Sequence, residues 1–259
     1  MPALIQPSAE PFFIPGGPTA CILVHGFTGS PKEMRGLGEQ LGADGHTVLG
    51  LRLAGHATQS DDLQRVRWRD WMASVEDGWH FLQGHLEPHP AASRSVFVVG
   101  LSLGGVIALV FASHTPVSGV VAISTPYTLP SDMWKWPSAH ILRVLRPQVE
   151  KGPADWHDAS AAQDHVAYLS YPRAAAFEIR DLLAVMRSRL ERVTCPVLMV
   201  HSKEDTVVSP ANAQRLFDRL TTSDKRILWV ADSGHVVVRE PPRALVFKAV
   251  SEFVARNAT

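Results

Sequence analysis

The stretch Ser95-Val96-Phe97-Val98-Val99-Gly100-Leu101-Ser102-Leu103-Gly104-Gly105 decides the fold of this chain. An apolar run typical of a buried strand leads into Ser102, and the apolar segment 105–112 that follows predicts a buried helix. A strand, a sharp turn and a helix in this order form the context of a nucleophile elbow. Because such a turn strains the backbone at the serine, side chains at Gly100 and Gly104 would collide with their surroundings. We therefore predict that Ser102 is a nucleophile held at a helix N-terminus, where free N–H groups favour negative charge.

A serine hydroxyl needs a base, and a group that orients the base, to act as a nucleophile at neutral pH. His235 is the candidate base, in a Ser-Gly-His loop after the strand-like run 226–230. Asp205 is the candidate acid, in the loop after the predicted strand 196–201. Each lies just past the carboxyl end of a predicted strand, which is the edge where open α/β sheets place their ligands.

Alternatives exist for both partners. The chain has 12 histidines, and His25 and His56 also lie in glycine-flanked turns, although both precede the serine. Glu204 is the closest alternative acid. Asp232, which is nearer to the candidate base in sequence, is more typical of a residue that shapes a loop.

A serine nucleophile also needs backbone donors for the oxyanion that it generates. The segment His25-Gly26-Phe27-Thr28-Gly29 follows the predicted strand 20–24, a position from which a backbone N–H can face the elbow. We expect the N–H groups of Phe27 and Leu103 to be the two donors. Gly26 allows the tight loop, and His25 is expected to brace it.

Strands and helices alternate along most of the chain. Besides the elbow strand, strands are predicted at 20–24, 47–51, 117–124, 196–201 and 226–230. The Ser-Pro-Lys-Glu sequence at 30–33 has the pattern of a capping box that opens the first helix. Tryptophan and aliphatic residues between 68 and 82 recur at helical spacing and predict a core-facing stripe. This alternation predicts a mainly parallel sheet with helices on both faces.

Residues 126–187 break this alternation, since no convincing strand occurs among them. We interpret them as a cap inserted before the acid strand, which leaves 1–125 and 188–259 as the core. A helix is predicted near 138–146, and a longer amphipathic helix from about Arg173 leads back into the sheet.

The motifs together resemble the α/β-hydrolase superfamily across nearly the whole chain. A closer resemblance, to small bacterial carboxylesterases and monoacylglycerol lipases, rests on residues 25–29, residues 100–105, the Ser-Gly-His loop and the insert. Gly-His-Gly is common in that group where this chain has Gly55-His56-Ala57, so this loop departs from the pattern. The resemblance implies an α/β-hydrolase fold and ester hydrolysis without a metal or organic cofactor, under a small helical cap that shapes the acyl pocket.

The expected reaction is hydrolysis of neutral, apolar esters, with short- to medium-chain acyl groups or as monoacylglycerols, through an acyl-enzyme. Trp134, Trp136 and Trp156 of the insert either line the substrate pocket or fasten the cap to the core, and the sequence favours neither. An acyltransferase or thioesterase could use the same triad. A non-enzymatic ligand-binding protein could use the cap pocket, but it would not need all three triad members.

The bulk composition agrees with a small-molecule enzyme. Lys plus Arg and Asp plus Glu both number 25, so no net charge recruits nucleic acid. No run approaches the roughly 20 apolar residues of a membrane span, and the first residues do not resemble a signal peptide. Cys21 and Cys195 precede strands that this fold separates by two others, so we expect free thiols, a cytoplasmic protein, and a monomer or small homo-oligomer.

Overall fold

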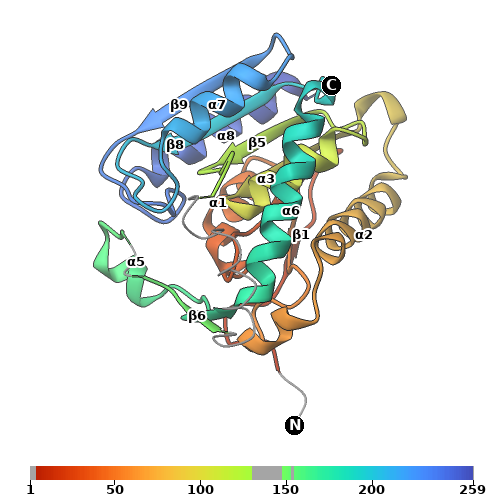
Figure 1. Cartoon of the computed structure of the whole chain (residues 1–259). Helices are drawn as coiled ribbons and strands as arrows, with labels where there is room; N and C mark the ends of the chain where they lie inside the picture. The colour runs from red at the N-terminus through yellow and green to blue at the C-terminus, as the bar shows by residue number, and fades with distance from the viewer. Residues whose placement is uncertain (1–3, 130–147, 153–154, 259) are drawn as a thin grey trace.

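The computed structural model describes residues 4–129, 148–152 and 155–258 of the 259-residue chain (Figure 1). A seven-stranded sheet with the order β1-β3-β2-β4-β5-β8-β9 forms its centre. The strands are β1 (Phe12–Ile14), β2 (Thr19–Val24), β3 (Thr47–Leu51), β4 (Ser95–Leu101), β5 (Gly119–Ile123), β8 (Val197–Ser202) and β9 (Lys225–Val230). All neighbouring strands are parallel except β1, which pairs with β3 in the antiparallel direction. The prediction of a mainly parallel sheet is confirmed, and the short edge strand β1 is an addition to it.

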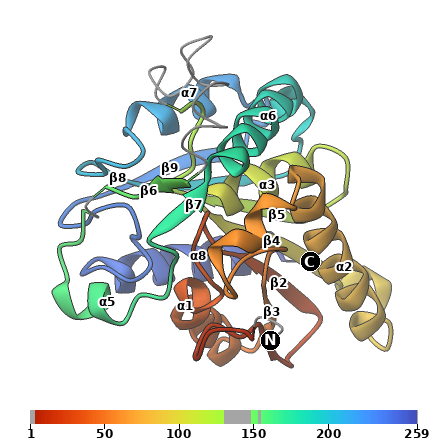
Figure 2. The same ribbon diagram turned by 60° about the horizontal axis from the view of Figure 1, so that its bottom comes forward.

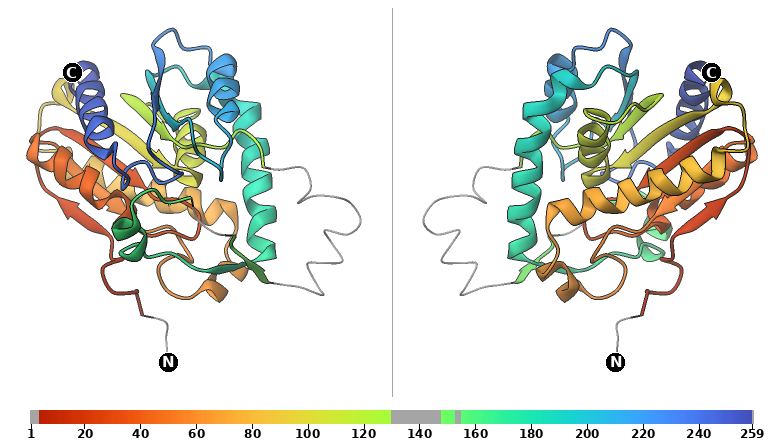
Figure 3. Two further views of the ribbon diagram at one scale, coloured as in Figure 1. Left: turned by 90° about the vertical axis from the view of Figure 1, so that its left-hand side faces the viewer. Right: turned by 90° about the vertical axis from the view of Figure 1, so that its right-hand side faces the viewer.

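Helices cover both faces of the sheet, as Figure 3 shows edge-on. The principal helices are α1 (Lys32–Ala43), α2 (Trp68–Leu86), α3 (Leu103–Ala112), α6 (Arg173–Arg189), α7 (Ala211–Arg219) and α8 (Arg243–Asn257). One face is covered by α1 and α8, whereas α2, α3 and α6 pack together on the other. Short 3₁₀ turns η1 (Ser60–Gln64), η2 (Ala91–Ser93) and η4 (Leu190–Arg192) lie in the connections.

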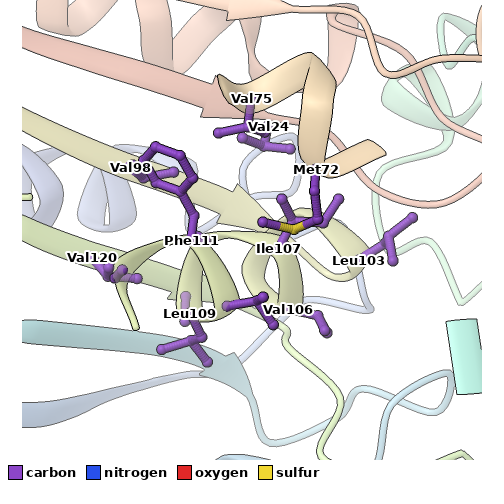
Figure 4. Packing of buried hydrophobic residues seen from close by; sticks show 14 of the residues in the cluster. Val24, Met72, Val75, Val98, Leu103, Val106, Ile107, Leu109, Phe111 and Val120 are labelled. Atoms are coloured by element: carbon purple, nitrogen blue, oxygen red, sulfur yellow. The ribbon is translucent and has the colours of Figure 1, made fainter. Parts of the chain in front are cut away.

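The helix that follows the elbow is the most deeply buried element. Every residue of α3 is buried, because the helix packs on β4 and β5 with α2 and α6 around it. Figure 4 shows Ile107 and Phe111 of this helix among Met72 and Val75 of α2 and Val98 of β4. Each such side chain contributes about 1.5–3 kcal/mol on burial. The start of α3, where Ser102 lies, is therefore held firmly against the sheet.

The predicted capping box at the start of α1 is wrong. The helix begins at Lys32 with Pro31 as its N-cap, and no side chain caps it. Ser30 instead donates from Oγ to Val166 O at 3.0 Å. Glu33 Oε2 accepts from the N–H of Gly26 at 2.8 Å. Since tertiary partners are available to both side chains, the local capping pattern does not form.

Between β5 and β8 the structure describes a two-stranded antiparallel pair and two helices. The pair consists of β6 (Gln148–Glu150) and β7 (Ser170–Pro172), with the short helix α5 (Ala159–Gln163) between them in sequence and α6 after them. Figure 2 shows the pair and α5 outside the main sheet. The sequence analysis missed this pair because three-residue strands carry no measurable periodicity. The prediction of a helix from about Arg173 is confirmed.

Part of the predicted insert lies outside the described residues. This part includes the helix predicted near 138–146 and two of the predicted pocket residues, Trp134 and Trp136. Cys21 and Cys195 are unpaired, and β4 and β5 separate β2 from β8. Among the helices in the described ranges, none has the length and apolar character needed to cross a bilayer.

Candidate active site

Ser102 lies between the end of β4 and the start of α3, in a strained backbone conformation. Its φ is 54° and its ψ is −112°, a region that residues with side chains rarely adopt. A Cβ at Gly100 would lie 2.1 Å from the backbone of Gly104, and a Cβ at Gly104 would lie 2.2 Å from Val24 O. Only glycine fits at these two positions, so the serine can make its sharp turn. The Ser102 N–H donates to Ile123 O at 2.8 Å and ties the turn to β5.

The structure brings His235 and Asp205 into direct contact. His235 Nδ1 lies 2.8 Å from Asp205 Oδ2, and the carboxylate is fully buried. Burial alone would raise the pKa of Asp205, but hydrogen bonds from His201 and His235, with the N–H of Val208, hold that pKa well below its usual range. The ionised carboxylate accepts a hydrogen bond from His235 Nδ1–H, which leaves Nε2 unprotonated and able to take a proton from a nucleophile.

The alternative acid and the neighbouring aspartate have other roles. Glu204 Oε1 accepts from the N–H of Asp232 at 3.0 Å, and its Oε2 lies 3.7 Å from His157 Nε2. Asp232 has a φ of 55° and lies in the bend that leads to His235. The structure therefore places Asp205, and not Glu204, beside the imidazole.

Ser102 and His235 lie at adjacent points of one sheet edge, linked through the end of β5. The serine N–H donates to Ile123 O, and the next residue, Ser124, donates from Oγ to His235 O at 2.8 Å. Within the described part of the chain, neither Ser102 Oγ nor His235 Nε2 has a hydrogen-bond partner. The hydroxyl and the imidazole are thus not hydrogen-bonded to each other. In unliganded active sites such contacts are often long and shorten when substrate binds.

The loop after β2 lies directly against the serine. A Cβ at Gly26 would be 3.6 Å from Ser102 Cβ. Among the residues that the structure describes, the N–H groups of Phe27 and Leu103 have no hydrogen-bond acceptor. Two unoccupied backbone donors beside a serine can stabilise an oxyanion.

The buried side chain of His25 joins this loop to the segment that follows β3. Its Nδ1 donates to Gly26 O at 2.8 Å, and its Nε2 accepts from the N–H of Leu53 at 3.1 Å. Burial lowers the pKa of His25 to about 4, since its effect exceeds the opposing effect of the hydrogen bond to Gly26 O, and Arg52 lowers the pKa a little further. The ring is therefore neutral at neutral pH, as these two bonds require. His56 packs beside it with ring centroids 5.0 Å apart.

The sequence analysis did not single out three residues that hold this site. His201 Nε2 lies 3.4 Å from Asp205 Oδ2. Ser124 fastens the base loop, and its position directly after β5 was a signal that could have found it. Glu33, assigned to a cap, holds Gly26 instead.

Trp156 is the only one of the three predicted pocket tryptophans within the described residues. Its ring packs against His165 with centroids 4.9 Å apart, and His165 Nε2 lies 3.5 Å from Glu33 Oε1. The Trp156 ring contact thus lies within the insert, and the His165–Glu33 contact joins the insert to α1. Across the described ranges, no group of three or more His, Cys, Asp or Glu side chains is arranged to hold a metal ion.

Comparisons with known proteins identify the family of this chain. The family model described as serine aminopeptidase, S33 (Hydrolase_4) matches residues 18–242. A thermostable monoacylglycerol lipase from Bacillus sp. (strain H-257) is 33% identical over 96% of this chain and 96% of its own length. A carboxylesterase from Bacillus subtilis (strain 168) is 27% identical over 95% of this chain and 96% of its own. A solved structure from work on the metagenome-derived lipolytic enzymes LipS and LipT superposes with a TM-score of 0.87 at 26% identity, covering 98% of this chain and all of that one. The chain therefore belongs to the serine aminopeptidase S33 (Hydrolase_4) family, and it is an α/β-hydrolase of the bacterial carboxylesterase and monoacylglycerol lipase type.

Proposed function

We propose that the protein hydrolyses carboxylic esters through an acyl-enzyme formed on Ser102. The observation that carries the proposal is the His235–Asp205 hydrogen bond at the sheet edge that also holds the strained serine. A parallel sheet folds without either a strained serine or a buried His–Asp pair at its edge. A buried carboxylate that fixes an imidazole tautomer is what a serine nucleophile requires.

In the first half of the reaction, Ser102 Oγ attacks the ester carbonyl carbon while His235 Nε2 takes the hydroxyl proton. Asp205 keeps the Nδ1 proton in place and stabilises the imidazolium that forms. The carbonyl oxygen becomes an oxyanion between the N–H groups of Phe27 and Leu103, and each such donor contributes roughly 2.7–4 kcal/mol to the transition state. The tetrahedral intermediate collapses as His235 returns its proton to the departing alcohol.

In the second half, water replaces the alcohol. His235 takes a proton from the water, whose oxygen attacks the acyl carbonyl. The same two N–H groups stabilise the second oxyanion, and the acid leaves when the proton returns to Ser102 Oγ. Every step of the proposed reaction uses protein groups and water, so it requires no metal or organic cofactor.

The substrates that we propose are neutral small-molecule esters with apolar acyl groups, either short- to medium-chain esters or monoacylglycerols. The Phe27 side chain contacts the ring of Tyr171 with centroids 5.0 Å apart, so an aromatic pair spans from the oxyanion loop to β7. Two similar proteins are named for monoacylglycerol lipase and carboxylesterase activity. We interpret residues 126–187 as a cap that shapes the acyl site, and we propose a cytoplasmic location with a monomeric or small homo-oligomeric state.

The proposal is tested with p-nitrophenyl esters of two to sixteen carbons, run beside monoacylglycerols. Ser102→Ala and His235→Ala should each lower kcat by at least about 10⁴-fold, and Ser102→Ala should abolish labelling by a fluorophosphonate. Ser113→Ala is the matched control, because Ser113 lies at the other end of α3 and its hydroxyl bonds only Val110 O. Near-parent turnover or labelling in Ser102→Ala would overturn the assignment. Faster cleavage of an amino-acid p-nitroanilide or a thioester than of every ester would assign a different substrate class.

A further inference from the structure

The loop that carries His235 is held almost entirely by side chains from other parts of the chain. Its backbone groups from 232 to 235 pair with Glu204, Ser202, Glu240, Asp155 and Ser124. In the described sheet the loop takes no part in strand pairing, since β9 ends at Val230. The position of the imidazole therefore depends on these side chains.

Asp155 joins the loop that carries His235, residues 232–235 (the base loop), to the loop after β8 that carries Asp205 and Thr206 (the acid loop). Its Oδ1 accepts from the N–H of His235 at 3.0 Å. Its Oδ2 accepts from the N–H of Thr206 at 2.9 Å and from Thr206 Oγ1 at 3.1 Å. Thr206 directly follows Asp205, so the Asp155 carboxylate ties the backbone of His235 to the backbone beside Asp205. His235 and Asp205 are the two residues that must stay hydrogen-bonded to each other during the reaction. N–H bonds to a carboxylate are charge-assisted and roughly twice as strong as neutral ones.

The backbone around Asp155 fits the base loop equally closely. A Cβ at Gly234 would lie 1.9 Å from Asp155 O, so glycine alone allows the two segments to meet. Glu240, whose side chain is fully buried, accepts from the N–H of Gly234 at 3.3 Å. The same carboxylate accepts from the N–H groups of His157 at 3.2 Å and Asp158 at 3.0 Å. Segment 155–158 is thus joined to the base loop twice, directly through Asp155 and indirectly through Glu240, which accepts from both.

We propose that Asp155, supported by Glu240, is a positioning residue for His235, and that segment 155–158 is part of the catalytic framework. The proposal rests on the role assigned to His235 above. A displacement of about 1 Å at a reacting group can lower the rate by about 10²-fold. Loss of the Asp155 carboxylate frees the N–H of His235 and loosens the base loop against the acid loop.

Asp164 offers a matched control within the same insert. Its carboxylate also joins the insert to the core, through Lys32 and through Arg239. These are exposed side-chain bonds that touch neither the base loop nor the acid loop. A general loosening of the insert would follow from either substitution, whereas loss of imidazole positioning follows only from the change at Asp155.

The test compares Asp155→Asn with Asp164→Asn in the full chain. An asparagine keeps one acceptor oxygen, and its NH₂ group faces an N–H donor that it cannot bind. We expect kcat of Asp155→Asn on a p-nitrophenyl ester to fall about 10- to 100-fold, with KM within about two-fold of the parent. Fluorophosphonate labelling of Ser102 should slow in proportion, and the downfield proton NMR signal of His235 Nδ1–H should broaden. Asp164→Asn should keep parent kcat and a sharp signal.

Equal kcat for the parent and Asp155→Asn would overturn the proposal, as would equal losses in the two variants or a loss confined to KM. Should Asp155→Asn fail to fold, Thr206→Ala replaces it, because this exposed residue loses only its hydroxyl donor to Asp155. It should lower kcat about three-fold without a change in Tm, and parent-like kcat would again refute positioning. If the parent protein neither hydrolyses esters nor reacts with the fluorophosphonate, the proposed function fails. The Nδ1–H signal still decides whether Asp155 positions the imidazole.

Discussion

Replacing Asp205 by asparagine should switch the His235 tautomer rather than merely weaken a contact. Asp205 Oδ1 accepts two backbone N–H groups, from Val207 at 2.9 Å and from Val208 at 2.7 Å. These donors require an oxygen at that position, so the asparagine NH₂ must take the place of Oδ2. It then faces His235 Nδ1 across 2.8 Å and donates to it. The imidazole proton moves to Nε2, which can no longer accept the proton of Ser102.

The size of the effect follows from this inversion. An imidazole in the wrong tautomer costs about 10⁴-fold in kcat, which corresponds to about 5.4 kcal/mol of transition-state free energy. The side chain of Asp205 is fully buried and asparagine has nearly the same volume, so the fold should survive. The assay is kcat on a p-nitrophenyl ester, normalised to the folded fraction measured by thermal unfolding.

Glu204→Gln is the control for this prediction. Glu204 is 44% exposed at its side chain and bonds the N–H of Asp232, which a glutamine oxygen can also accept. Its kcat should stay within about three-fold of the parent. An Asp205→Asn enzyme that keeps kcat within ten-fold, or a Glu204→Gln enzyme that loses as much as Asp205→Asn, would refute the reasoning.

Three further predictions concern packing, pH and thiol reactivity. Gly100→Ala should destabilise the protein by about 3 kcal/mol in urea unfolding, because its Cβ would lie 2.1 Å from backbone atoms. Gly84→Ala in helix α2, where the added Cβ meets no atom within 4 Å, should instead stabilise the protein by about 0.5–1 kcal/mol, and equal effects of the two substitutions would be inconsistent with a steric cause. Burial lowers the pKa of His25 to about 4 from an unfolded value of about 6.5, so the stability that this neutral ring contributes is fully present above pH 6.5 and falls by about 3 kcal/mol as the pH drops to 4. In urea unfolding at pH 7.5 and 4.5, the free energy of unfolding of His25→Gln should fall less between the two pH values than that of the parent, and an equal fall would count against this. Burial raises the pKa of Cys21 to about 12 and that of Cys195 to about 11. Ellman's reagent at pH 8 should therefore titrate no thiol in the native protein within minutes and two thiols in guanidinium, and a rapid reaction of the native protein would contradict this prediction.

The sheet and the elbow could be predicted because their signals are local. The strand before Ser102 is a continuous apolar run, and the glycines around the serine satisfy a steric need of the turn itself. The same holds for α6, whose start near Arg173 follows from amphipathic spacing. Elements without such periodicity, β1 and the β6–β7 pair, were missed because each strand has only three residues.

The roles of Glu33 and Asp155 in supporting the site were not predictable, since their partners are distant in sequence. Glu33 fits a capping box by spacing, yet the buried N–H of Gly26 is its partner in the folded chain. Asp155 bonds the N–H of His235, which is 80 positions away. Spacing rules describe contacts within a turn or two of helix, so neither bond has a signature that they can detect.

The difference between the proposed nucleophile and the proposed base follows from how each is held. Ser102 comes directly after β4 and directly before α3, so the hydrogen bonds of a strand and the packing of a buried helix fix its backbone. His235 comes after the end of β9, and the backbone of its loop is fixed by side chains from four other places in the chain: Asp155, Glu240, Ser124 and Glu204. A residue that rigid elements hold tolerates change in distant parts of the chain, whereas a residue that scattered side chains hold does not. Substitutions outside the triad that lower turnover without unfolding the protein should therefore gather around the base loop, not around the elbow.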